Sequence, residues 1–123
     1  MKAAAVDDTA TQAACPVLFG DPSAVAKDVF GLDGAYIWEG DGNTETEAPP
    51  RTDLGCTLKM VGGGTKELYI AWFSTSPDGW AGGKIGTSGG LTYGLDTRKK
   101  TLTADQSKKV ADWMAAAAKH VKD

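Results

Sequence analysis

The sequence predicts an α+β fold, in which an antiparallel sheet of about four strands carries a short N-terminal helix and a long C-terminal helix on one face. Residues 56–61 alternate between apolar and polar, and residues 66–73 are apolar on both faces, which together predict two neighbouring strands. An apolar stripe at helical spacing over 104–121 predicts a long amphipathic helix. Sixteen glycines in 123 residues favour turns and irregular loops between these elements.

The first expected element is a flexible leader. Residues 1–14 are rich in Ala, Thr and Asp, so we expect the α+β domain to span 15–123. A short helix is expected over 23–30. Asp21-Pro22 suits an N-cap and a first helical position, and Gly31 supplies a C-terminal stop.

The middle of the chain predicts the sheet. A strand is expected over 35–39, followed by a long acidic loop over 40–55. The strand over 66–73 is expected to be central, because apolar residues on both faces need cover on both sides. Gly62–Gly64 predicts the turn before it. This glycine run is not a phosphate loop, because it lacks the Lys-Ser/Thr ending and the following helix.

Towards the C-terminus, residues 74–90 read as a glycine-rich loop that contains a short strand at 84–87. Residues 91–95 predict a further strand. Thr103 stands three positions before Gln106, which is the spacing of a capping box, and it opens the long C-terminal helix.

Cys15 and Cys56 are the only cysteines and stand 41 positions apart. A bond between them would join the N-terminal segment to the sheet, and loop closure of this length stabilises a fold by about 4 kcal/mol in the chain-entropy model. The alternative is two separate buried thiols, since free cysteine packs as a small apolar residue. Small secreted domains use disulfides widely, so we predict the bond.

Charge is unevenly distributed along the chain. Residues 1–55 carry three Lys/Arg and ten Asp/Glu, a balance of −7, whereas residues 56–123 carry ten and six, a balance of +4. The net charge of −3 and the shortness of Arg98-Lys99-Lys100 argue against a nucleic-acid partner. The sequence contains no run of 18 apolar residues, so it predicts no membrane-spanning helix. Val6-Asp7-Asp8 interrupts the apolar core that a signal peptide needs. Two interpretations remain open: the protein is cytosolic, or the chain is the mature form of an exported protein.

The order of these features resembles that of small extracytoplasmic lipoproteins of actinobacteria, many of which belong to families of unknown function. The shared features are a cysteine before a short helix that ends in Gly31, an acidic loop, a second cysteine that opens a strand, further strands and a final helix. The resemblance covers about 15–121. It implies a Cys15–Cys56 disulfide, a location in the cell envelope, anchoring there in a full-length form, and a binding function rather than a reaction.

No catalytic signature, cofactor motif or metal site is predicted. His120 is the sole histidine, and its place in the last helical turn suits a contact with the helix dipole better than a catalytic triad. One histidine and two separated cysteines do not make a zinc site. The acids of the expected loops match a calcium loop only loosely. They are Asp41, Glu45, Glu47, Asp53 and Asp78.

The aromatic residues predict a binding site more directly. Trp80 lies in a loop of Gly, Ser and Asp, where an indole ring can present an apolar face beside polar neighbours. We therefore expect a ligand to stack on Trp80, with Asp78 as a hydrogen-bond acceptor and Tyr93 nearby. The alternative is that Trp80 folds over the sheet edge as part of the core.

Together these features predict a non-enzymatic binding or interaction domain outside the cytoplasm, secreted or in the cell envelope. Its partner would be a small molecule, a glycan or a protein. A protein inhibitor or immunity-type partner is the main alternative, because Arg98–Lys100 or the acidic loop could serve as a charged contact surface. A small hydrolase that uses loop carboxylates is a weaker alternative.

Overall fold

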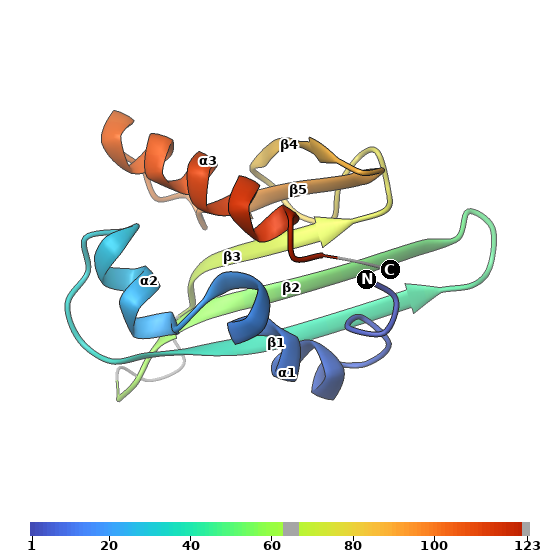
Figure 1. Ribbon diagram of the computed structural model, residues 1–123, viewed down its shortest axis with the longest axis horizontal. Coiled ribbons are helices and arrows are strands. Elements are labelled where there is room, and N and C mark those ends of the chain that lie inside the picture. Colours follow the sequence, from blue (N-terminus) through green and yellow to red (C-terminus); the bar gives the residue numbers. More distant parts are fainter. Residues whose placement is uncertain (63–66, 122–123) are drawn as a thin grey trace.

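The computed structural model of the chain describes residues 1–62 and 67–121 and has the predicted α+β architecture (Figure 1). Within these residues the sheet has five antiparallel strands, one more than the four or so expected. The elements in chain order are α1 (Asp8–Phe19), α2 (Pro22–Asp28), β1 (Tyr36–Glu45), β2 (Arg51–Met60), β3 (Glu67–Ser74), β4 (Lys84–Ser88), β5 (Leu91–Asp96) and α3 (Ala104–Ala118).

The strands lie in the order β1-β2-β3-β5-β4, so that β3 is central, as its two apolar faces predict. All three helices pack on one face of the sheet, with α1 and α2 over β1 and α3 towards β5 (Figure 1). The opposite face carries no helix among the described residues. This difference between the two faces decides where a ligand can reach the sheet.

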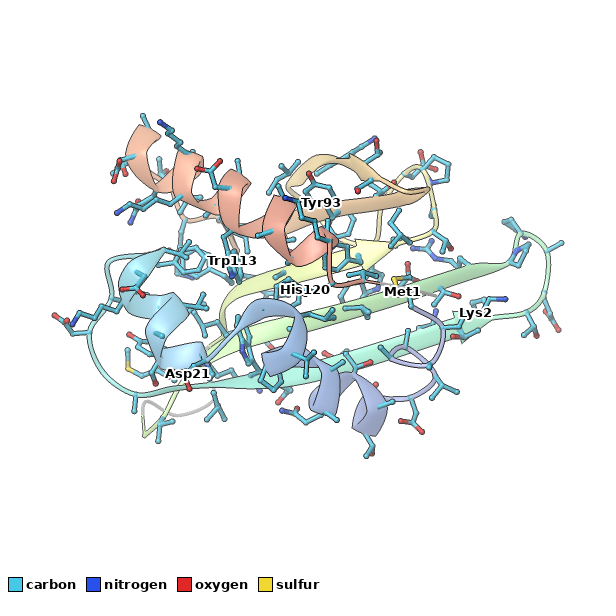
Figure 2. All side chains as sticks on the ribbon, viewed as in Figure 1. Met1, Lys2, Asp21, Tyr93, Trp113 and His120 are labelled. Carbon is cyan, nitrogen blue, oxygen red and sulfur yellow. A yellow bond between two sulfur atoms is a disulfide. The ribbon has the colours of Figure 1, made fainter. Side chains whose placement is uncertain are left out.

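The core lies between the helices and the sheet, and aromatic rings fill its centre. Trp113 of α3 points towards α1 and α2 (Figure 2), with its ring centre 5.3 Å from that of Phe19 and 5.9 Å from that of Phe30. The indole nitrogen of Trp113 donates to the carbonyl of Phe19 at 2.9 Å, and that of Trp38 donates to the carbonyl of Gly20 at 2.8 Å. Both indole groups thus enter the core with their donors satisfied.

Both predicted helix starts are confirmed. The carboxylate of Asp21 caps α2, and Thr103 and Gln106 form the reciprocal capping box at the start of α3. The apolar stripe of α3 faces the core as expected, although the helix ends at Ala118, before the predicted residue 121. The buried residues of α3 are Val110, Met114 and Ala117.

The structure differs from the flexible leader expected over 1–14. Helix α1 begins at Asp8, with the carboxylate of Asp7 accepting from the backbone N–H of Ala10 at 2.8 Å. The side chain of Thr11 is fully buried and donates to the carbonyl of Ala4 at 2.7 Å. The polar composition predicted a disordered segment because only a few residues of this segment are buried, and they are scattered along it. They are Met1, Ala5 and Thr11.

Helix α1 covers the free edge of strand β1. The side-chain amide of Gln12 donates to the carbonyl of Trp38 at 2.7 Å and accepts from the backbone N–H of Gly40 at 2.8 Å. One turn earlier, the carboxylate of Asp8 accepts from the backbone N–H of Gly42 at 3.0 Å. Side chains of the helix therefore satisfy backbone groups that a sixth strand would otherwise pair, which protects the edge from other chains.

The acidic loop predicted over 40–55 is also wrong, because β1 extends to Glu45 and β2 begins at Arg51. Glycine and acidic residues predicted a loop, but the glycines of β1 instead leave space for helix α1. A Cβ atom on Gly40 would lie 2.5 Å from the backbone nitrogen of Gln12, and one on Gly42 would lie 2.3 Å from Oγ1 of Thr11. The close approach of α1 thus requires glycine in an otherwise regular strand.

The turn predicted at Gly62–Gly64 falls largely outside the described residues, which stop at Gly62 and resume at Glu67. Strands β2 and β3 on either side of it pair antiparallel, with a register shift between Leu58 and Lys59.

The predicted disulfide is confirmed: Cys15 and Cys56 are bonded, and both residues are fully buried. The bond joins the middle of α1 to β2, across the strand that α1 covers. Helix α1 is therefore held to the sheet by a covalent bond as well as by its hydrogen bonds to β1.

Replacing both cysteines by alanine should lower the free energy of unfolding by about 2–5 kcal/mol, because the unfolded chain regains the freedom that the bond removes. Urea unfolding of the two proteins measures the difference. A reductant should destabilise the parent protein by a similar amount and leave the double variant unchanged. A loss below about 1 kcal/mol would show that packing alone holds α1 in place.

Candidate functional site

The loop over residues 75–83, which we call the Trp80 loop, partly covers the helix-free face of the sheet. Side chains of paired residues in an antiparallel sheet point to the same face. Gly55 of β2 pairs with Asp41 of β1 and with Trp72 of β3, so these three positions share the helix-free face. The Trp80 loop crosses this face above them.

Trp80 lies directly on the sheet at Gly55. A Cβ atom on Gly55 would be 1.9 Å from Cζ3 of Trp80, so only glycine leaves space for the ring at this position. The residue remains 36% exposed. The ring of Trp80 thus rests on the sheet, while the residue remains partly accessible to solvent. This arrangement is intermediate between the exposed binding surface and the core residue that the sequence left open.

Trp72 holds the Trp80 loop from beneath. Trp72 is fully buried. A Cβ atom on Gly79 of the loop would lie 2.5 Å from its ring, and a Cβ atom on Gly94 of β5 would lie 2.6 Å from it. The indole nitrogen of Trp72 donates to the carbonyl of Gly82 at 2.9 Å. The two tryptophans therefore differ: Trp72 fixes the loop, and Trp80 is presented by it.

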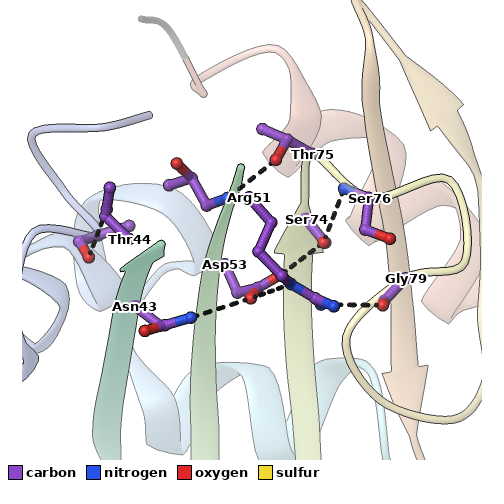
Figure 3. Close-up of polar contacts among 10 residues, drawn as sticks. Asn43, Thr44, Arg51, Asp53, Ser74, Thr75, Ser76 and Gly79 are labelled. Atoms are coloured by element: carbon purple, nitrogen blue, oxygen red, sulfur yellow. Dashed lines mark hydrogen bonds and ion pairs between the residues drawn. The ribbon is translucent and has the colours of Figure 1, made fainter. Parts of the chain in front are cut away.

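A polar network around Asp53 fixes the start of the same loop (Figure 3). The Arg51 guanidinium donates to both carboxylate oxygens of Asp53, at 2.8 and 2.9 Å, and to the carbonyl of Gly79 at 3.1 Å. The hydroxyl of Ser74 donates to Asp53 and accepts from the backbone N–H of Ser76 at 3.0 Å. The loop is therefore anchored at both ends before any ligand binds.

These contacts set the charge state of Asp53, which is only 2% exposed. Burial by itself raises the pKa of Asp53, but hydrogen bonds from Arg51, Ser74 and Asn43 outweigh it and the pKa is lowered. The carboxylate stays ionised and fully engaged, which suits a structural anchor rather than a proton donor.

Asp41 lies on the same face and behaves in the opposite way. Burial raises the pKa of Asp41, and the negative charges of Asp8, Glu39 and Glu67 raise it further. Lys59 lowers the pKa only in part and is itself ion-paired with Glu39. Asp41 therefore combines a perturbed pKa with a position one strand away from the residue that supports Trp80, as functional carboxylates often do.

The three residues predicted for the site are not brought together. Asp78 is exposed in the Trp80 loop, two positions before Trp80. Tyr93 pairs with Phe73, and their ring centres are 5.9 Å apart, so Tyr93 lies on the helix-covered face (Figure 2). Trp80 lies over the opposite face, at Gly55. Proximity in the glycine-rich segment suggested the grouping, but strand alternation sends Tyr93 to the other side.

Sequence reasoning missed Gly55 and the place of Asp41. Both lay within the segment interpreted as a loop, so no face could be assigned to either residue. An isolated glycine in a strand marks the close approach of another group, and this signal becomes readable only when β2 is extended back to Arg51.

Other chemistry considered from the sequence finds no further support in the described residues. His120 is exposed in the turn that follows α3. Within residues 1–62 and 67–121, no three His, Cys, Asp or Glu side chains gather as a metal site. No helix in the same part of the chain is long and apolar enough to cross a membrane.

Comparison with family models, with curated proteins and with solved structures finds no match to this chain. The resemblance to actinobacterial envelope lipoproteins therefore stays a prediction.

The opposite pKa directions of Asp41 and Asp53 predict opposite effects of the same substitution. Asp53→Asn should cost about 1–3 kcal/mol near pH 7, because charge-assisted bonds to Arg51 are lost. Asp41→Asn should raise stability slightly, by less than about 1 kcal/mol, because a repelled and partly desolvated charge is removed.

The pH dependence of stability provides a control for both substitutions. A lowered folded pKa makes Asp53 stabilising above its unfolded pKa of about 4, and this contribution is lost as pH falls through the lower folded value. A raised folded pKa makes ionised Asp41 destabilising, and this cost disappears as pH falls through both values. Urea unfolding near pH 7 and at about pH 2.5 should show both differences shrinking in acid. A loss of stability in Asp41→Asn near pH 7 would contradict the assignment.

Proposed function

We propose that this chain is a binding domain of an oxidising compartment outside the cytoplasm, and that it holds a saccharide on the helix-free face of its sheet. The observation that carries the proposal is that Trp80 is partly exposed, with its ring supported on Gly55 and presented by a loop that is anchored independently of it.

The disulfide supports this choice of compartment. The described cysteines are both bonded, and disulfides persist mainly in secreted and envelope proteins. The bond fastens α1, whose side chains close the edge of β1, so the fold depends on oxidation for part of its stability.

The chemistry of the face supports a saccharide as the ligand class. A sugar ring has an apolar face that can stack on an indole and hydroxyl groups that can donate to a carboxylate. Trp80 supplies the first surface, and Asp41 supplies the acceptor on the neighbouring strand. The anchored loop adds preorganisation, so less conformational entropy is lost when the ligand binds.

Binding fits these residues better than glycoside hydrolysis. Hydrolysis uses two carboxylates with separate acid and base duties. Among the acids of this face, Glu39 is ion-paired with Lys59, and Asp53 is held by Arg51. These partners favour a recognition surface in which Asp41 acts as an acceptor.

The proposal is tested by moving the Trp80 ring without deleting it. Gly55→Ala places a methyl group where the ring lies, so it should displace Trp80 and weaken saccharide binding by about 1–3 kcal/mol, as Trp80→Ala should. Gly82→Ala is the matched control. It lies in the same loop, has no heavy atom within 4 Å of a new Cβ, and keeps its carbonyl for Trp72.

Binding can be followed by NMR titration with a panel of soluble oligosaccharides that includes N-acetylglucosamine oligomers. The indole N–H signal of Trp80 should shift with at least one of them, and Gly82→Ala should bind as the parent does. Equal affinities of Gly55→Ala and Gly82→Ala would place the site elsewhere. A panel that leaves the Trp80 signal unmoved would exclude saccharides as the ligand class.

A further inference from the structure

A hollow at one end of the sheet is lined by threonines from neighbouring segments. Thr44 of β1 pairs with Thr52 of β2, and the backbone N–H of Thr75, just after β3, donates to the carbonyl of Thr52 at 2.9 Å. Thr46 follows the end of β1. These four threonines line a hollow of about 390 Å³, a volume within the range of small-molecule sites.

The threonine of β2 points to the side of the sheet that carries the helices. Successive residues of a strand point to opposite faces. Thr52 therefore shares the face of Cys56, which is bonded to α1, and not the face of Gly55, which supports Trp80. Thr44 is paired with Thr52 and shares this face. The threonines of the two strands thus lie on the face opposite the Trp80 site.

Thr52 brings an unused hydroxyl group to the hollow. The residue is only 4% exposed, and its backbone N–H donates to Oγ1 of Thr75 at 2.8 Å. Its own hydroxyl has no hydrogen-bond partner among the described residues. No side-chain N or O atom in those residues is both shut off from solvent and unpaired, so this hydroxyl opens to the hollow that Thr52 lines. A nearly buried polar group of this kind gains a hydrogen bond when a ligand occupies the hollow.

The other threonines add donors and acceptors around Thr52. Oγ1 of Thr75 accepts from the backbone of Thr52 and keeps its own proton to donate. The hydroxyl of Thr46 is unbonded within the described residues, and that of Thr44 donates to a backbone carbonyl at 3.4 Å and can still accept. Threonine methyl groups and Pro50 supply apolar surface. The hollow thus combines apolar walls with hydroxyl groups that both donate and accept.

The charged residues around the hollow offset one another. Lys2, Glu45 and Arg51 are the charged residues that line it. Arg51 lies opposite Glu45 in the strand register and is ion-paired with Asp53 at 2.8 Å. Counted with Asp53, the two cations and the two carboxylates cancel. The hollow therefore has no net charge with which to select an ion.

We propose that this hollow binds a small neutral molecule with several hydroxyl groups, that is, a single sugar ring or a cyclic polyol. The threonine hydroxyls form hydrogen bonds with the hydroxyls of the ligand, which also both donate and accept. The carbon atoms of the ligand ring lie against the apolar walls. This site is independent of the saccharide proposed for the Trp80 face.

The experiment follows the threonine methyl signals of the whole protein by NMR while single sugars are added. The neutral probes are glucose, galactose, mannose and myo-inositol. Glucuronate and glucosamine, in mildly acidic buffer, are the charged comparators, because they keep the ring of glucose and add a negative or a positive charge. At least one neutral probe should shift the methyl signals of Thr44, Thr52 and Thr75. The tightest neutral probe should bind more tightly than either charged sugar.

A substitution at Thr52 tests the unused hydroxyl directly. Thr52→Val removes the hydroxyl and keeps the shape of the side chain. It should weaken binding of the tightest neutral probe about two- to tenfold, because one hydrogen bond to the ligand is lost. The thermal midpoint should not fall, since the hydroxyl has no partner within the described residues.

Thr92→Val is the matched control. Thr92 of β5 is 3% exposed, its hydroxyl also has no partner in the described part of the chain, and it does not line the hollow. This variant should bind the probes as the parent protein does.

The proposal is overturned if no neutral probe moves the threonine methyl signals, or if a charged sugar binds most tightly. Equal losses in Thr52→Val and Thr92→Val would contradict it as well. Loss of the methyl shifts in Trp80→Ala would show that the hollow is only a part of the Trp80 site. Shifts that persist in Trp80→Ala, with a Trp80 indole signal that never moves in the parent, would support the hollow and contradict the function proposed for the Trp80 face.

Discussion

The close approach of α1 to strand β1 is the constraint on which the rest of the structure depends. It is possible only because Gly40 and Gly42 carry no side chains where the helix backbone passes. Once the helix is there, Gln12 bonds the free edge of the strand, and Cys15 reaches Cys56 on the next strand. Edge protection, burial of the N-terminal segment and the disulfide are therefore consequences of one contact.

Glycine has the same function on the other face of the sheet, with a different outcome. Gly55 admits the ring of Trp80, and Gly79 and Gly94 admit that of Trp72. Since Gly55 and Cys56 are adjacent in β2, their positions point to opposite faces. The strand that the disulfide fixes from the helix side is therefore the strand that supports Trp80 from the other side.

The sequence predicted the features that depend on local pattern. The capping box at Thr103 and the apolar stripe of α3 are confirmed because each is set by spacing within one helix. The leader, the loop over 40–55 and the grouping of Tyr93 with Trp80 are not, because each depends on contacts between distant segments. In the sequence, a glycine that permits a long-range contact cannot be told from a glycine that forms a turn. The predicted strands β1 and β2 are therefore too short, and Asp41 cannot be assigned to a face of the sheet.

The uneven charge of the sequence becomes a spatial arrangement because of the strand order. The acidic first half of the chain supplies β1 and the start of β2 at one side of the sheet. Elements β4, β5 and α3 at the other side together carry three Lys and three Asp, so they have no net charge. Burial raises the pKa of Asp41, and the repulsion from neighbouring carboxylates that raises it further thus arises at the β1 side of the sheet. The uneven charge of the sequence therefore gives one acidic side of the sheet, at β1, rather than two surfaces of opposite charge.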